Sequence, residues 1–314
     1  MKKTFARATT GVPIRGVLQG VLAYALWGIV PLYWKSLDRV SAAELVAHRV
    51  LWGVGALLIF VVAAGQSSTL LAALRQARLV AVMGLSGTVL AINWGVFVWA
   101  TTSGHLLDAS LGYFINPLVS IALGTLVLRE RLRPLQWIAI ALAMMGVAVL
   151  TWRVGRVPWT ALVLAFTFGT YGLIRKVAKV KALVGSAIET ILLAPVAVVY
   201  LGVLGSQGAF GHADAATHLL LIGTGVVTAV PLVLFTSAAR ELPLTMVGFL
   251  QYLAPTGQFL VATFMFREPL ANAQLAAFVL IWIGLAVFSV DLWRRVPPRG
   301  PGRRRQARVT MRPA

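Results

Sequence analysis

The sequence predicts an all-α, polytopic membrane protein of ten transmembrane helices in two inverted five-helix repeats, with both termini in the cytoplasm. Three observations predict this fold class. The chain of 314 residues is 59% hydrophobic and 12% charged, with a mean hydropathy of +0.85. Apolar stretches of roughly 20 residues, the length that crosses a bilayer, follow one another along almost the whole chain. Part of the sequence also repeats itself at a shift of 138 positions.

The first repeat is expected to occupy residues 16–152, after a short cytoplasmic segment at 1–15. Gly104 marks a turn between two of its spans. Its last span starts at Pro134, because the first residue of a helix makes no use of the N–H that proline lacks. The predicted spans of this repeat are 16–34, 41–64, 78–101, 107–128 and 134–152.

The second repeat is expected at residues 157–293. Gly155 separates it from the first repeat, the stretch 205–211 marks a turn, and Pro243 begins a span. The tail at 294–314 carries eight arginines. We expect it to be disordered and to lie against anionic lipid headgroups. The predicted spans of the second repeat are 157–176, 183–203, 216–238, 243–266 and 270–293.

The basic residues predict the orientation of the bundle. With the N-terminus in the cytoplasm, 22 of the 28 Lys and Arg fall in inner segments, five fall in outer segments, and Arg49 lies within a span. Cytoplasmic loops of membrane proteins carry this excess. An even number of spans returns the C-terminus to the cytoplasm. The net charge of +19 therefore reflects topology and not a nucleic-acid partner, since no soluble domain is present to carry a binding groove.

The repeat itself runs from Pro117 to Val149, which matches Pro255 to Val287 at eleven of 33 positions without a gap. This shift carries the fourth and fifth spans onto the ninth and tenth, so each copy holds five spans. An odd number of spans forces the second copy to enter the membrane upside down. The loops agree, because the inner loop 129–133 has three arginines while its outer copy 267–271 keeps one.

Several stretches of the chain resemble those of a known family. They are AYALWGIVPLYWK (23–35), ELVAHRVLW (44–52), NWGVFVWA (93–100), ASLGYFINPL (109–118), GLIRK (172–176), ETILLAP (189–195) and GFLQYLAPT (248–256). Together they resemble the drug/metabolite transporter superfamily with its EamA domains, and within it the RarD branch, the chloramphenicol-sensitive protein type. The resemblance covers roughly residues 16–293. It implies a secondary transporter or exporter of small metabolites in the bacterial inner membrane, and it implies no particular substrate or ligand residue.

Ionisable residues inside spans are functional candidates, because each costs about 2.5–3.5 kcal/mol at mid-helix. Glu44 and His48 of the second span are four positions apart and share a face. Arg49 lies roughly 12 Å into the span. This cluster either binds solute or exchanges a proton near the outer mouth, or it is an internal ion pair that fixes helix packing. Glu189 holds a comparable early position in the seventh span and is a further coupling candidate. If buried, Glu189 must be protonated or paired with another helix.

Prolines and polar groups near the bilayer midplane predict where a solute binds. Pro117 and Pro255 lie at equivalent positions of the repeat and are candidate kink or gating residues. Each frees a backbone carbonyl that must find a partner or line a wet cavity. Aromatic and amide side chains at similar depth suit a neutral or amphipathic organic solute, and we expect about half of them to face lipid or other helices instead. These candidates are Trp27, Asn93, Trp94, Tyr113, Asn116, Tyr171, Gln251 and Tyr252.

Signals of enzymatic chemistry are absent from the sequence. It contains no phosphate-binding glycine loop, no His-Glu-x-x-His and no cysteine, so we expect no catalytic residue, cofactor or metal. Without an ATP site, transport would be facilitative or driven by an ion gradient. We therefore expect a small-molecule permease that works by alternating access, as a monomer or homodimer. The alternatives are a non-transporting membrane protein, such as a receptor or assembly factor, and, third, a membrane enzyme. Solute flux in proteoliposomes separates these classes.

Overall fold

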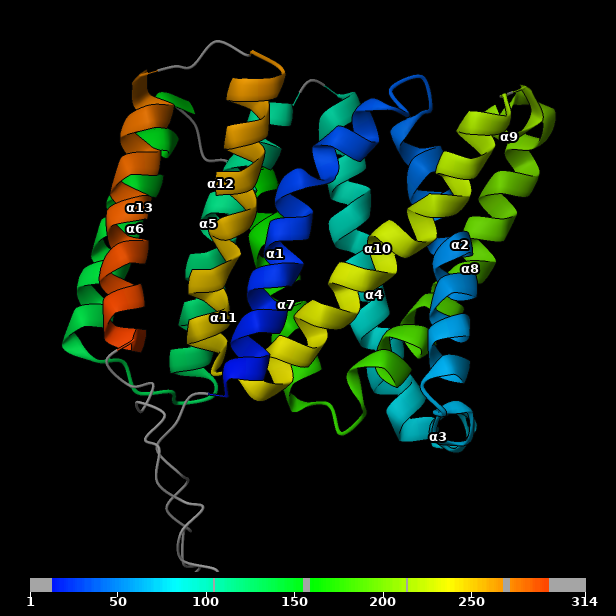
Figure 1. The fold of residues 1–314 in the computed structure, drawn as a ribbon, viewed down its shortest axis with the longest axis horizontal. Coiled ribbons are helices and arrows are strands. Elements are labelled where there is room, and N and C mark those ends of the chain that lie inside the picture. The colour runs from blue at the N-terminus through cyan, green and yellow to red at the C-terminus, as the bar shows by residue number, and fades with distance from the viewer. Residues whose placement is uncertain (1–12, 104, 155–158, 213, 268–271, 294–314) are drawn as a thin grey trace, which may run out of the picture.

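The computed structural model describes residues 13–103, 105–154, 159–212, 214–267 and 272–293, and Figure 1 traces them. Within these ranges every regular element is helical. The predicted N-terminal segment lies outside the described residues except for its last three. The predicted basic tail at 294–314 lies outside them entirely.

The first half of the described chain forms α1 (Ile14–Lys35), α2 (Ala42–Ala63), α3 (Ser67–Leu74), α4 (Ala77–Thr102), α5 (Leu106–Leu126) and α6 (Pro134–Val154). Helix α2 begins after Ser41, whose Oγ accepts a hydrogen bond from the backbone N–H of Glu44 at 3.3 Å, as an N-cap does. Helix α3 was not predicted, because eight residues are too few to show a spanning signal. Leu70 and Ala73 bury one of its faces against α4 and α8.

The second half forms α7 (Trp159–Val177), α8 (Ala182–Leu204), a 3₁₀ turn (Gly205–Gln207), α9 (Ala209–His212), α10 (Ala215–Glu241), α11 (Leu244–Gln251), α12 (Leu253–Leu260), a π-helical turn (Val261–Met265) and α13 (Asn272–Trp293). The predicted span 243–266 corresponds to α11, α12 and the π-helical turn, and the kink expected at Pro255 falls next to a break between α11 and α12. The helix is interrupted at Tyr252. Pro255 explains the break, since it has no N–H to donate to the carbonyl of Gln251 four residues earlier.

Seven of the described helices are long and apolar enough to cross a membrane, namely α1, α2, α4, α6, α8, α10 and α13. The other three predicted spans fall on elements that do not meet this criterion. The apolar part of α5 is the shorter stretch Ser110–Leu126, α7 ends with Arg175 and Lys176, and α11 and α12 have eight residues each. The protein is thus a helical, multi-pass membrane protein, while the count of ten spans stays a prediction.

The helices stand side by side in one bundle (Figure 1). Helices α6 and α13 pair at one edge, α2 and α8 pair at the opposite edge, and α1, α5, α7, α11 and α12 lie between them. The start of α1 and the end of α13 lie at the same end of the bundle, at the bottom of Figure 1. This end is called the α1-start end below.

The contacts between helices are largely symmetric: when each helix of one half is exchanged with its counterpart in the other half, most of the same pairs are in contact. When α1, α2, α4, α5 and α6 are exchanged with α7, α8, α10, α11–α12 and α13, the pair α1–α12 becomes α7–α5, and α1–α10 becomes α7–α4. The pairs α2–α8 and α6–α13 map onto themselves. Single residues show the same reciprocity. A Cβ on Gly146 would lie 3.0 Å from Ala277 O, and one on Gly284 would lie 2.9 Å from Ala139 O. Both residues of the second contact are 138 positions from those of the first.

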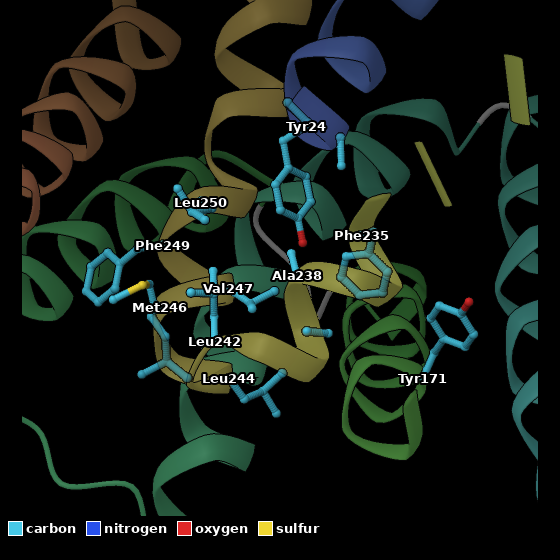
Figure 2. Packing of buried hydrophobic residues seen from close by; sticks show 14 of the residues in the cluster. Tyr24, Tyr171, Phe235, Ala238, Leu242, Leu244, Met246, Val247, Phe249 and Leu250 are labelled. Atoms are coloured by element: carbon cyan, nitrogen blue, oxygen red, sulfur yellow. The ribbon is translucent and has the colours of Figure 1, made fainter. Parts of the chain in front are cut away.

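A packed cluster of apolar side chains fills the bundle toward the α1-start end, and Figure 2 shows it from close by. Its members include Leu242, Leu244 and Val247, which are all fully buried, around the start of α11. Glu130, from the loop before α6, holds this start in place. Its Oε1 accepts a hydrogen bond from Leu244 N at 2.7 Å and its Oε2 accepts one from Thr245 N at 2.9 Å. A carboxylate at a helix N-terminus satisfies N–H groups that have no partner within the helix. We call the packed cluster of apolar side chains the floor.

Candidate functional site

A cavity of about 330 Å³ lies above the floor, between the helices of both halves. Tyr24, Leu90 and Leu232 belong to both the floor and the cavity wall, so the two are contiguous. On α1 the wall extends from Tyr24 to Trp34, toward the end of the bundle opposite the α1-start end. This volume is within the range of pockets that bind small organic ligands. Most of the wall is aromatic or aliphatic, with a few polar groups.

Four prolines inside helices each remove one backbone hydrogen bond of the helix next to this cavity. In each case the residue four positions before the proline, whose carbonyl loses its helical donor, lines the cavity. These pairs are Pro31 with Trp27, Pro117 with Tyr113, Pro231 with Val227, and Pro255 with Gln251. One of the freed carbonyls has found a donor, because Gln258 Nε2 donates to Trp27 O at 3.3 Å. The prolines therefore place unusual backbone polarity next to the cavity.

Arg49 carries a positive charge on the cavity wall. Its guanidinium carbon lies 5.1 Å from the ring centroid of Trp34 and 5.0 Å from that of Trp94. Its Nε donates to Thr228 Oγ1 at 3.0 Å. Cation–π contacts of this kind stabilise a positive charge without a carboxylate. The arginine is thus anchored to α1, α4 and α10 at once.

Amide side chains supply the other polar groups of the wall. Asn93 Nδ2 donates to Leu164 O and to Thr167 Oγ1, both at 2.9 Å, and so joins α4 to α7. Gln251 Nε2 donates to Ser120 Oγ at 3.0 Å, which joins α11 to α5. Asn116 Oδ1 is buried, and no hydrogen-bond donor reaches it within the described part of the chain. Asn116 thus lines the cavity, while its unpaired Oδ1 is itself buried.

The cavity brings together many of the residues singled out by the sequence. Those on its wall are Trp27, Arg49, Asn93, Trp94, Tyr113, Asn116, Gln251 and Pro255. Two predicted tyrosines lie elsewhere. Tyr171 is fully buried and donates to Glu189 Oε2 at 3.3 Å, and Tyr252 donates to Phe114 O at 3.3 Å. Pro117 is not on the wall, although Tyr113 and Asn116 beside it are.

Glu189 lies away from the cavity in a buried ion pair. Its Oε1 is 3.3 Å from Nη1 of Arg175, and the two side chains are 1% and 0% exposed. Arg175 also donates through Nη2 to Ala182 O at 2.9 Å. A Cβ at Gly185 would collide with this guanidinium, so a glycine is needed there. Charge counting placed Arg175 among the inner basic residues, and the structure adds that it is buried in the bundle beside Glu189 of α8.

Glu44 and His48 lie in a separate pocket beside α9. His48 Nε2 is 3.7 Å from Glu44 Oε1, and the same carboxylate oxygen accepts a hydrogen bond from Ala209 N at 2.7 Å. The imidazole stacks on Phe210, with ring centroids 5.4 Å apart. Glu44 and His48 thus hold the α9 segment against α2, and Arg49 points to the other site.

Sequence reasoning missed several residues of the cavity wall. Some are apolar aromatics that look like ordinary core, and Thr228 and Gln258 are single polar residues with no motif around them. One signal was available, because Pro31 and Pro231 lie inside apolar helices just as Pro117 does. The missed residues include Tyr24, Trp34, Phe97, Ser110, Phe168, Thr228 and Gln258.

Known proteins resemble this chain along most of its length. Residues 14–152 match the EamA-like transporter family. An uncharacterized transporter of Pseudomonas aeruginosa is 47% identical over 91% of this chain and 98% of its own length. The protein RarD of Escherichia coli is 42% identical over 88% of this chain and 94% of its own length. The chain belongs to the EamA-like transporter family. The chloramphenicol-sensitive protein RarD of Pseudomonas aeruginosa, at 33% identity over 91% of this chain and 98% of its own length, lies in the same group.

The EamA-like fold also has a counterpart among solved structures. A crystal structure matches with a TM-score of 0.71 over 89% of this chain and 98% of the other, at 21% identity. At this identity the likeness concerns the fold alone. The resemblance read from the sequence motifs, to EamA domains and to the RarD branch, is confirmed.

Proposed function

We propose that this EamA-like protein is a secondary transporter of small organic solutes in the bacterial inner membrane. The observation that carries the proposal is the cavity of about 330 Å³ enclosed by helices of both halves. A transporter site is expected at such a place, near interrupted helices between two repeats. The relatives named as transporters support the same class of function.

The proposal includes ten spans in two inverted repeats, with both termini in the cytoplasm. The reciprocal contacts of Gly146 and Gly284 support a two-fold exchange of the halves. The basic residues support the orientation. In that orientation the α1-start end is cytoplasmic, so the cavity extends toward the outside and the floor seals the inside. The described state is then outward-facing, and transport requires the floor to open while the outer part of the cavity closes.

The test is solute flux in proteoliposomes loaded with a bacterial metabolite extract. Mass spectrometry compares what leaves these vesicles with what leaves protein-free vesicles. We expect a defined set of metabolites to leave only through the protein. Specific binding of a partner without any flux would overturn the proposal in favour of a receptor or assembly factor. Chemical turnover without net movement would favour a membrane enzyme.

Two variants connect flux to the cavity. Asn116→Ala removes a polar group from the wall, so we expect it to reduce flux. Arg267→Ala changes a residue that is remote from the wall, so we expect flux to stay near the wild-type level with expression matched. Equal activity of the two variants would contradict a role for the cavity.

A further inference from the structure

Among the described residues that line the cavity, Arg49 carries the only full charge, since the others are aromatic, aliphatic, hydroxyl or amide side chains or glycine. No carboxylate of the described chain lies within ion-pair distance of it. Two buried acids of the bundle have other partners, Glu44 with His48 and Glu189 with Arg175. A charge inside the membrane is costly and normally has a partner. The partner of Arg49 is therefore missing from the described protein.

The contacts of Arg49 leave one part of its guanidinium unused. Thr228 takes the Nε–H, and the two indoles of Trp34 and Trp94 contact the group through their rings. The two Nη groups make no hydrogen bond to any described residue. These groups carry four of the five N–H donors of arginine. Their fork geometry matches the two oxygens of a carboxylate or a similar oxyanion.

From this geometry we infer that the transported solute is an organic anion with a flat apolar body. Its oxyanion binds the Nη groups of Arg49, and its body lies against the aromatic wall formed by Trp27, Phe97, Tyr113 and Phe168. The inference rests on the proposed transport function and specifies its substrate class.

The other charge classes fit this wall less well. Aromatic walls alone attract cations, but here a fixed guanidinium would repel a second positive charge in a cavity of low dielectric constant. A neutral solute would leave the arginine without a counter-charge. An anion neutralises it and at the same time replaces the hydrogen bonds that the Nη groups lose when water leaves.

The experiment uses the full chain in vesicles of phosphatidylcholine alone, so that no anionic lipid headgroup competes for Arg49. The vesicles contain the metabolite extract described above. We expect the released compounds to be flat organic acids, with neutral amides and amines retained. Arg49→Gln should reduce release of these acids at least ten-fold. Arg39→Gln is the matched control, because it removes a charge from an exposed turn outside the cavity, and release should not change.

The outcomes separate the inference from the proposed function. If neutral or cationic compounds were released and acids retained, the inference of an anionic solute would be overturned, while the proposed transport function would still hold. Release of nothing would overturn transport and the anion with it. The elution profile from size-exclusion chromatography shows whether Arg49→Gln is folded. If the folded variant released acids as fast as the wild type, the role of Arg49 would be overturned.

A competition measurement on the wild-type protein needs no variant, and it stays decisive if Arg49→Gln does not fold. The probes are 2-naphthalenesulfonate, which is permanently anionic, and its neutral sulfonamide. We expect the sulfonate to inhibit release at a concentration at least ten-fold lower than the sulfonamide. Equal inhibition by the two probes, or stronger inhibition by the sulfonamide, would overturn the inference.

Discussion

The hydroxyl of Tyr252 donates a hydrogen bond to the carbonyl oxygen of Phe114, 3.3 Å away, and the two residues are 138 positions apart. This is the spacing of the sequence repeat, so each residue contacts its own counterpart. Contacts between counterparts lie on the axis that relates two halves. The break between α11 and α12 occurs at this same tyrosine, beside the cavity, where Tyr252 packs with Ile281 of α13.

Replacing Tyr252 tests whether this contact is structural. Tyr252→Phe removes the hydroxyl alone, so we expect a loss of about 0.5–1.5 kcal/mol in stability. Tyr252→Ala also removes a buried ring and should cost about 3–5 kcal/mol. Thermal unfolding in detergent measures both. Because Tyr252 is not on the cavity wall, the phenylalanine variant should keep the apparent KM of the transported solutes, and a raised KM would show that the hydroxyl contacts solute.

Sequence reasoning located the cavity through residues that are out of place in apolar helices. Prolines and amides such as Asn116 and Gln251 stand out because lipid offers them no partner. The rotation of a helix is harder to predict. Tyr113 and Tyr171 have the same chemistry and similar depth, but Tyr113 is 39% exposed on the cavity wall and Tyr171 is fully buried against Glu189. The surroundings of Tyr171 depend on tertiary contacts, its hydrogen bond to Glu189 of α8 and its stacking on Phe235 of α10.

The charged residues show that a count of basic residues per loop does not predict which of them are buried. The rule that basic residues gather in the cytoplasm treats every Lys and Arg near a helix end alike. It could not show that Arg175 is buried in the bundle in a pair with Glu189. In the same way, the adjacent positions His48 and Arg49 were read as one cluster. A helix turns about 100° per residue, so the two side chains enter different pockets.

The buried pair of Arg175 and Glu189 predicts a strong coupling between the two side chains. Glu189→Gln leaves the guanidinium buried without its counter-charge, so we expect a loss of about 3–5 kcal/mol in stability. Arg175→Met combined with Glu189→Leu removes both charges and should recover most of that loss. Thermal unfolding of the single and double variants measures the coupling.

The same double variant distinguishes a structural pair from a coupling site. We expect it to transport solute at a rate near that of the wild type, since the pair lies away from the cavity. A double variant that is as stable as the wild type but has lost flux would show instead that Glu189 exchanges a proton during transport.

The absence of cysteine makes the chain suited to labelling, which tests the outward-facing state. Ser110→Cys places a thiol in an exposed position on the cavity wall, and Val247→Cys places one in the fully buried floor. A membrane-impermeant maleimide added outside should label the first variant rapidly and the second slowly. Added inside, it should reach the second variant only when the floor opens. Fast labelling of Val247→Cys from outside would contradict a sealed floor.

Gly28, at the contact between α1 and α12, and Gly95, in α4, predict opposite effects of the same substitution. A Cβ at Gly28 would lie 3.0 Å from the Cα of Gly257, whereas one at Gly95 would meet nothing within 4 Å. Gly28→Ala must push the two backbones apart, and overpacking of this kind costs about 1–3 kcal/mol. Gly95→Ala lowers the flexibility of the unfolded chain without a clash and should add about 0.5–1 kcal/mol. Thermal unfolding followed by tryptophan fluorescence should therefore shift in opposite directions. A rise in both variants would show that α1 and α12 do not approach as closely as Gly28 and Gly257 indicate.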